Sequence, residues 1–280
     1  MSSENNEQTQ EFKVLELGEI QDTKLLCSLL YPDGKELQDF TLKALTRKDL
    51  KVLKNETLAK QRPLQWLKTA VETVVDNFDG AAPKSVVSHL SLNDMMYILY
   101  RSHLKNFGNI LPDVKYNCPH CYQDSIVQLD LNKVLVDYPT DKCYSTDTFD
   151  FIPDDKIEIS FKDSTFVVRK IVFRHVVFGD SIKYESSFKP NQQSTYVEQV
   201  YSDCCVSIEC EDGTVFDSSQ AKMICFNIIN NKLSVKDSSK LEGHFSKRPG
   251  VRNYISVECP ACSMIADFRS PFFYLFPQKL

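Results

Sequence analysis

The sequence KYNCPHCYQDSIVQL, residues 115–129, contains the first half of a motif whose second half lies in SVECPACSMIADF, residues 256–268. Each half holds a Cys-Pro-X-Cys segment between two runs in which apolar and polar residues alternate, as they do in β-strands. Two residues between the thiols allow a tight turn to present both sulfurs to one metal ion, with backbone amides donating to them. We therefore predict that two strand-flanked knuckles bind one structural zinc ion, with the ligands Cys118, Cys121, Cys259 and Cys262.

Residues 122–258 separate the knuckles, whereas the cysteine pairs of a compact zinc ribbon lie about 15–20 residues apart. One ion joins them only if the intervening chain leaves and returns at neighbouring strand ends. Two alternatives stay open here: knuckles that share no ion, and a thiol oxidoreductase, because Cys-Pro-His-Cys also occurs at thioredoxin-like active sites. An oxidoreductase needs a helix after the motif, and the residues after Cys121 alternate like a strand instead. His120 is a further candidate ligand, although four cysteines already complete a tetrahedral site.

Strand and helix patterns place the knuckles in an α+β fold with an insertion. We predict β-hairpins and a split zinc-ribbon-like knuckle pair, with a helical insertion between the two CxxC motifs. Four segments are expected along the chain. They are a disordered tail over 1–11, an N-terminal α+β domain over 12–132 that ends in the first knuckle, an inserted strand-plus-helical region over 133–250, and the second knuckle with an aromatic C-terminal segment over 251–280.

Turn and cap residues locate several elements. Pro32-Asp33-Gly34 predicts the turn of a β-hairpin between two apolar runs. Ser91, with an acidic residue three positions later, is typical of a helix start, and Gly108 is typical of a left-handed helix end. We expect several helices over 174–246, with breaks at Pro190, at Glu211-Asp212-Gly213 and at Asn230-Asn231.

Charge and hydropathy exclude several classes of protein. The chain has 280 residues, with 33 Lys and Arg against 38 Asp and Glu, so its formal charge is −5. A mildly acidic chain is not a general nucleic-acid binder, although a basic run over 47–62 leaves one local candidate. No apolar run approaches the roughly 18 residues of a membrane span, and the polar start lacks the features of a secretory signal. We therefore expect a cytoplasmic protein without a membrane partner.

The sequence also lacks the patterns of a catalyst. Its eight glycines form no phosphate-binding loop, and we find no nucleophile elbow and no paired acid and base. A zinc ion closed by four thiolates leaves no coordination position for a substrate. We therefore predict a protein that is not an enzyme and has no small-molecule substrate. Isolated histidines are read as core residues rather than bases, namely His89, His103, His175 and His244.

Two further features call for an interpretation. Six cysteines repeat no ligand spacing, and we expect them to be small buried apolar residues. They are Cys27, Cys143, Cys204, Cys205, Cys210 and Cys225. The run FRSPFFYLFP, residues 268–277, gathers five aromatic side chains, which either fold back onto the domain or insert into a partner.

The run SLNDMMYILYRSHLKNFGNILPDVKYNCPHC, residues 91–121, followed by SIVQLDL, VECPAC and a Phe-rich end, resembles a phage family. It is similar to the baseplate hub and hub-assembly proteins of T-even-type contractile-tailed bacteriophages. In that family a helix with an Asp near its start and an Arg in its body leads through a Gly to a strand and a CxxC. Asp94, Arg101 and Gly108 occupy those places here, before the first of the two cysteine pairs. The resemblance covers 90–132 and 250–280, and it leaves 133–250 unmatched.

The resemblance implies a non-enzymatic structural or assembly protein of the central hub of a phage tail baseplate. Its implied partners are other baseplate hub or tail proteins, and its implied location is the host cytoplasm during assembly. It either stays in the virion baseplate or acts only as an assembly factor. The residues support one alternative, a zinc-ribbon nucleic-acid-binding or transcription-associated factor, because such ribbons often contact nucleic acid and 47–62 is basic.

Overall fold

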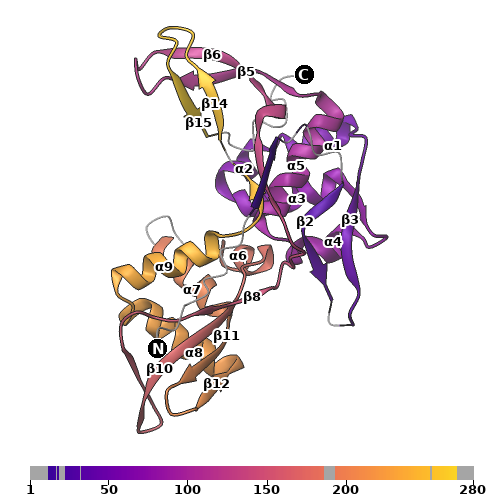
Figure 1. Ribbon diagram of the computed structural model, residues 1–280. Coiled ribbons are helices and arrows are strands. Elements are labelled where there is room, and N and C mark those ends of the chain that lie inside the picture. The colour runs from indigo at the N-terminus through magenta and orange to yellow at the C-terminus, as the bar shows by residue number, and fades with distance from the viewer. Residues whose placement is uncertain are drawn as a thin grey trace.

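Two lobes, each with an apolar core of its own, make up the computed structural model of the chain (Figure 1). The structure describes residues 12–16, 18, 23–31, 33–185, 193–252 and 254–269. We call the lobe that carries both CxxC motifs the knuckle lobe, and the lobe whose core gathers residues between 149 and 245 the inserted lobe. The predicted tail over 1–11 and residues 270–277 of the aromatic run lie outside the described residues. In the described ranges, no helix combines the length and apolar character that crossing a membrane requires.

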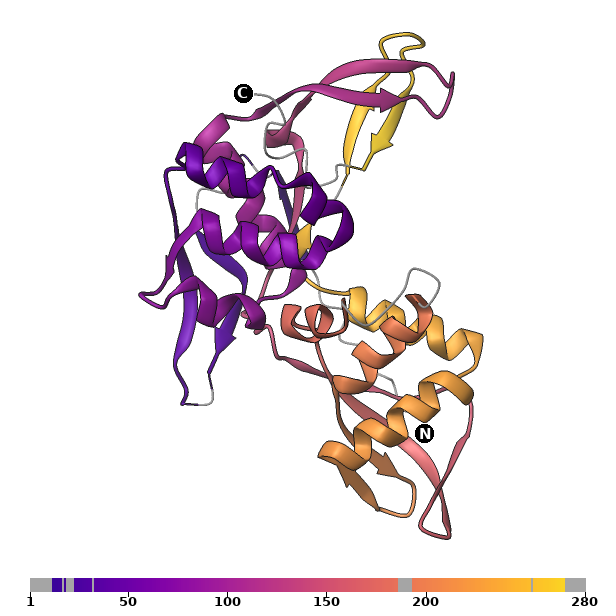
Figure 2. The ribbon, with the colours of Figure 1, turned by 180° about the vertical axis from the view of Figure 1, so that it is seen from behind.

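The first half of the knuckle lobe is a small antiparallel sheet with helices against it (Figure 2). The predicted hairpin is confirmed, because its two strands pair on either side of Gly34, which has a positive φ of 82°. The strands are β2 (Lys24–Leu30), β3 (Glu36–Leu42) and β4 (Val75–Phe78), in that order across the sheet. The helices are α1 (Arg47–Leu53), α2 (Glu56–Gln61), α3 (Pro63–Val74), α4 (Pro83–Val86) and α5 (Leu92–Phe107), with a 3-10 turn η2 (Val87–His89).

Helix α5 is held to the sheet by a buried carboxylate. As the sequence predicts, the helix begins after Ser91 and ends at Gly108, whose φ is 83°. Asp94 is fully buried and accepts from the Ser91 hydroxyl at 2.6 Å and from the Leu26 and Cys27 N–H groups of β2 at 2.7 and 3.2 Å. Burial raises the pKa of this carboxyl, and the three donors oppose that rise. The Asp94 side chain therefore holds the capping residue Ser91 and fixes the start of the helix against β2.

A three-stranded sheet brings the two distant parts of the knuckle lobe together. Its strands are β1 (Phe12–Glu16), β7 (Leu135–Pro139) and β13 (Gly250–Val251), with β7 in the centre. The chain leaves the knuckle lobe for the inserted lobe after β7 and comes back to the knuckle lobe at β13. The return is shown by the pairing of β13 with β7, in which Gly250 lies opposite Asp137 and Val251 opposite Val136. A Cβ on Gly250 would lie 2.5 Å from the Asn93 side-chain nitrogen, so a larger residue would displace Asn93 from its hydrogen bond to the Pro249 carbonyl.

An ion pair reinforces the return of the chain beside β13. The Arg252 guanidinium donates to the Asp137 carboxylate from two nitrogens, Nε at 3.0 Å and Nη2 at 2.8 Å from Oδ1. Both side chains are partly shielded from solvent, which strengthens such a two-point contact relative to a fully exposed pair. The two ends of the insertion therefore leave the knuckle lobe from adjacent strands.

The inserted lobe is an antiparallel sheet with three helices. The strands are β8 (Thr148–Phe151), β9 (Ile157–Phe161), β10 (Ser164–Arg174), β11 (Cys205–Cys210) and β12 (Val215–Asp217), and the helices are α7 (Gln193–Asp203), α8 (Ser218–Asn231) and α9 (Val235–Ser246). The strand order across the sheet is β12-β11-β10-β8. Strand β9 pairs with the first half of β10, residues 164–168, and β8 pairs with its second half, residues 171–174. The expectation of helices within 174–246 is wrong over 205–210 and 215–217, which are strands, whereas the predicted break at Glu211–Gly213 is present as the turn of their β-hairpin. The short apolar run VSI suits a strand as well as a helix, so periodicity alone cannot separate them.

Helix α6 (Phe178–Glu185) connects the lobes. Phe178 is buried in the core of the knuckle lobe, and its N–H donates to the Leu90 carbonyl at 2.8 Å. The Glu185 carboxylate accepts from the first-turn N–H groups of α3, Leu64 at 2.5 Å and Gln65 at 3.1 Å. A negative charge at a helix N-terminus is favourable, so α6 supplies the cap that the residue before α3 does not.

We expect Asp94→Ala to lower the free energy of unfolding by about 3 kcal/mol, because three buried donors lose a charged acceptor. Urea denaturation followed by circular dichroism measures the change. Asp76→Ala is the matched control, since Asp76 is an exposed carboxylate on β4 and should change the free energy by less than about 0.5 kcal/mol. Equal stability of the two variants would contradict the assigned role of Asp94.

Candidate metal centre

The first CxxC motif forms the tip of a hairpin. Strands β5 (Ile110–Asn117) and β6 (Asp124–Asp130) pair in antiparallel register, and Cys118–Cys121 joins their ends. The Tyr122 N–H donates to the Cys118 carbonyl at 2.8 Å, and the His120 N–H points to the Cys118 sulfur at 3.4 Å. Tyr122 adopts a positive φ of 58°, which reverses the chain into β6. The local backbone thus supplies a turn of the kind that aims two thiols in one direction.

The second motif repeats this geometry at equivalent positions. Strands β14 (Ile255–Glu258) and β15 (Ile265–Phe268) form the hairpin. The Ser263 N–H donates to the Cys259 carbonyl at 2.9 Å, the Ala261 N–H lies 3.4 Å from the Cys259 sulfur, and Ser263 has a φ of 57°. Proline stands second in both motifs, so two unrelated stretches of chain build the same knuckle.

The two knuckles bring their four sulfurs into one cluster. The Sγ atoms all lie within 4.8 Å of one another, with 3.7 Å between Cys118 and Cys262 and 3.7 Å between Cys121 and Cys259. Four sulfurs at about 2.3 Å from a tetrahedral ion are about 3.8 Å apart, so the cluster has the size of a four-thiolate metal site. These separations are far longer than a sulfur–sulfur bond of about 2.05 Å, which excludes disulfides between the knuckles.

Burial makes the cluster a closed one. Cys118 and Cys259 are fully buried and belong to the core of the knuckle lobe, while Cys121 and Cys262 are partly buried. The Tyr116 ring lies beside the cluster and contacts Phe268 edge-on at 6.1 Å between centroids. Four sulfurs that fill a tetrahedron leave no open position, which is the arrangement of a structural site rather than a catalytic one.

The electrostatics of the cluster favour a cation. Burial raises the pKa of the Cys118 thiol, but the N–H groups of Cys121 and His120 and the adjacent thiols outweigh it and lower that pKa to about 6. The Met264 N–H lowers the pKa of Cys262, but burial and the neighbouring thiols outweigh it and raise that pKa to about 12. Crowded sulfurs cannot all ionise against one another. A divalent ion at their centre removes this conflict, so the four cysteines together can bind a metal.

The remaining candidates lie elsewhere. His120 is exposed, and only its backbone N–H approaches a sulfur. The six other cysteines are all buried, as expected, and they lie outside the cluster. Cys27 and Cys143 form a pair, with their sulfurs 2.7 Å apart. His103 and His175 are buried, while His89 is exposed and His244 lies half-buried against Phe149.

The basic run over 47–62 is partly neutralised. Lys60 pairs with Glu56 at 3.0 Å, and Arg62 lies 3.8 Å from the Glu185 carboxylate. Helix α1 begins after Thr46, with a capping box in which Thr46 and Asp49 accept from each other's backbone N–H groups. Helices α1 and α2 pack on α3 through their apolar side chains, so most cations of the run lie on the solvent-facing side of these two helices.

Sequence reasoning did not find the residues that bring the knuckles together. Asp137 and Arg252 are 115 positions apart, and neither belongs to a recognisable motif. Tyr122 and Ser263 each follow directly after a CxxC motif, and both have a positive φ. This equal spacing could have predicted the repeated turn, although a positive φ is usually signalled by glycine and neither residue is one.

A family model described as T4 bacteriophage base plate protein matches residues 27–269 of the chain. The match spans both knuckles, and it includes residues 133–250, for which the sequence resemblance had no counterpart. Neither a curated protein nor a solved structure matches the chain.

We expect Cys118→Ser and Cys259→Ser each to abolish stoichiometric metal binding and to lower the melting temperature by on the order of 10 °C. Mass spectrometry under native conditions measures the metal, and differential scanning calorimetry measures the melting. Cys210→Ala is the matched control, since Cys210 is also a buried thiol but lies outside the cluster. A metal content that is the same in all three variants would contradict the site.

Proposed function

The chain belongs to the family of T4 bacteriophage base plate proteins, and from this membership we propose that it is a non-enzymatic structural or assembly protein of the baseplate hub. The single observation that carries the proposal is the family match over residues 27–269. A protein of this family belongs to the virion baseplate, and its contacts are with other phage tail proteins. Beyond what family membership gives, we propose that the protein belongs to the hub of the baseplate and that it assembles in the host cytoplasm.

We further propose that the metal is zinc and that its role is structural. Zinc accepts tetrahedral thiolate sets without redox change, and the 3.7 Å sulfur separations suit its bond lengths. Cys118, Cys121, Cys259 and Cys262 would hold it, with backbone N–H groups of each knuckle directed at their sulfurs. The ion would supply apparent binding free energy on the order of 10–16 kcal/mol, which in such a site contributes to folding.

Exposed apolar side chains on the knuckle hairpins support a role in protein contacts. Tyr122 is 78% exposed, Ile126 68%, Met264 50% and Ile265 66%. They follow or flank the two motifs on β6, β15 and the two turns, in a part of the knuckle lobe that projects away from the inserted lobe (Figure 1). Large apolar side chains left in water on two neighbouring hairpins are candidates for contacts with a partner protein. The zinc ion would hold both hairpins in the orientation that presents them.

The charges near the knuckles count against the nucleic-acid alternative. The two hairpins carry more carboxylates than cations among their described residues, with Lys115 the exposed cation on β5. The carboxylates are Asp113, Asp124, Asp130, Glu258 and Asp267. Phosphate binding depends on clustered cations, so these hairpins are poorly suited to it.

Purification of the tagged protein from infected, nuclease-treated cells tests the proposal. We expect other baseplate proteins in the eluate by mass spectrometry, with about one zinc per chain by elemental analysis. Capture of polymerase subunits, or of partners lost on nuclease treatment, would contradict it and favour the nucleic-acid alternative. Zinc-free protein with a selectively alkylated Cys118 would favour redox chemistry.

The cysteine variants separate folding from assembly in the same experiment. We expect Cys118→Ser to lose its baseplate partners together with its zinc, while Cys210→Ala keeps both. Retention of all partners by a zinc-free Cys118→Ser protein would show that the centre does not support assembly.

A further inference from the structure

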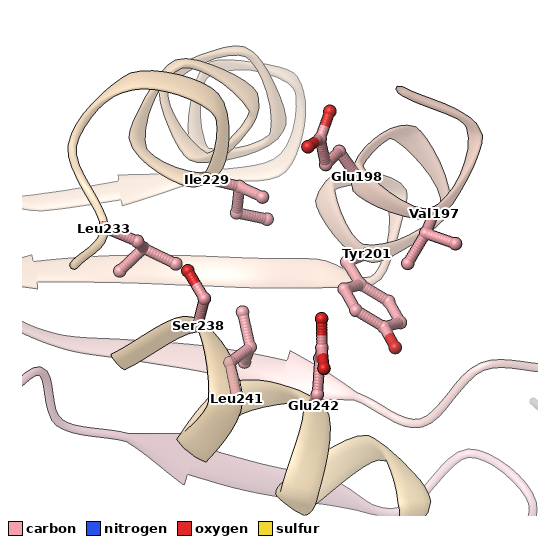
Figure 3. A pocket seen from close by; sticks show the side chains of 8 residues that line it. All are labelled: Val197, Glu198, Tyr201, Ile229, Leu233, Ser238, Leu241 and Glu242. Carbon is pink, nitrogen blue, oxygen red and sulfur yellow. The ribbon is translucent and has the colours of Figure 1, made fainter. Parts of the chain in front are cut away.

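A cavity of about 230 Å³ lies among α7, α8 and α9 of the inserted lobe (Figure 3). Its inner lining is aliphatic and comes from all three helices and the turn after α8. The residues are Val197, Ile229, Leu233 and Leu241. Leu241 belongs to the core of the lobe, whereas the other three are only partly buried, so the cavity opens that core toward solvent.

One wall of the cavity is a fixed aromatic ring. Tyr201 of α7 stacks on Phe245 of α9, with 4.0 Å between ring centroids and 7° between ring planes. This contact joins the two helices on either side of the opening, so the cavity is preformed. A preformed apolar site costs little ordering entropy when a partner enters it.

Among the described residues that line the cavity, two are acidic and none is a cation. Glu198 projects from α7 and Glu242 from α9 on opposite sides of the opening (Figure 3). The lysines of α9 do not neutralise them, because Lys236 and Lys240 both pair with Asp154, at 2.8 and 2.6 Å. Two carboxylates beside an apolar cavity therefore present a negative rim to any approaching molecule.

An exposed valine extends the apolar surface beyond the rim. Val235 is 86% exposed, the largest value among the apolar side chains of the described ranges. It lies three and seven positions before Ser238 and Glu242, so it shares a helical face with these two residues of the cavity. Val235 therefore adds an exposed apolar side chain on the α9 face that carries Ser238 and Glu242.

We infer that this cavity receives a basic, apolar segment of a neighbouring baseplate protein. A large apolar side chain of that segment fills the cavity, and an adjacent Lys or Arg pairs with Glu198 and Glu242. The inference rests on the proposed function for the identity of the neighbour, and on the cavity for its chemistry. A volume of about 230 Å³ is below the roughly 300–1,000 Å³ of small-molecule sites, but it suits the anchoring side chain of a protein interface.

A photo-reactive residue at position 238 identifies the occupant. Full-length protein with p-benzoylphenylalanine in place of Ser238 is assembled into baseplates, irradiated and analysed by mass spectrometry. We expect one cross-linked segment from another baseplate protein, with a large apolar residue next to a Lys or Arg. The same probe at Glu211, an exposed position on the β11–β12 turn, is the control and should not label that segment. Labelling of an acidic segment, of a second copy of this chain, or of no protein in an assembled baseplate would overturn the inference.

Charge reversal tests the acidic rim independently. We expect Glu198→Lys/Glu242→Lys to weaken binding of the cross-linked protein about tenfold or more, and Glu198→Gln/Glu242→Gln to weaken it less. Glu211→Lys is the control with the same kind of charge change at a position away from the cavity. A compensating Lys→Glu or Arg→Glu change in the cross-linked segment should restore binding to the charge-reversed protein. Circular dichroism of each variant shows whether the fold is retained.

The outcomes separate this inference from the proposed function. Unchanged binding by the charge-reversed protein, in baseplates that still contain it, would overturn the cavity and leave the baseplate role intact. Absence of the unmodified protein from baseplates and from their assembly intermediates would overturn the baseplate role itself.

Discussion

The pairing of β13 with β7 is the contact on which the metal centre depends, because it returns the chain to the place it left. Residues 122–258 form the loop between the knuckles. Compared with a compact ribbon of about 15–20 intervening residues, this loop is about three doublings longer, which adds only about 2 kcal/mol of closure entropy. That cost is small beside the binding energy of a four-thiolate zinc ion. The long insertion therefore costs the metal centre little stability, because β7 and β13 hold its two ends side by side and the Asp137–Arg252 ion pair reinforces that pairing.

The pairing of β7 with β13 also allows a lobe with its own core to be inserted into the chain of the knuckle lobe. The inserted lobe has an apolar core separate from that of the knuckle lobe, so each lobe buries apolar side chains of its own. Helix α6 limits the independence of the two lobes, since Phe178 enters one core and Glu185 caps α3 at Leu64. The lobes are thus fixed in relation to each other by a few specific contacts, which suits a component of a large assembly.

Local chemistry made much of this structure predictable. Thiol spacing identified the four cysteines that come together, and turn or cap residues such as Ser91 and Gly108 marked real element ends. The predictions failed where the structure depends on contacts between residues far apart in the sequence. The strand over 205–210 was assigned to helix because a short apolar run has no period that decides it. No sequence pattern shows that Glu185 caps a helix about 120 residues earlier, or that three helices enclose a cavity.

The extent of the family match bears on what the inserted lobe is for. The matched range, residues 27–269, contains the inserted lobe as well as both knuckles. A role for that lobe therefore has to be argued from its own chemistry. A structural lobe that only filled space would bury its apolar side chains and pair its charges. This one leaves Val235 exposed and sets Glu198 and Glu242 around an open cavity without a cation lining it, which is the chemistry of a surface that meets a partner.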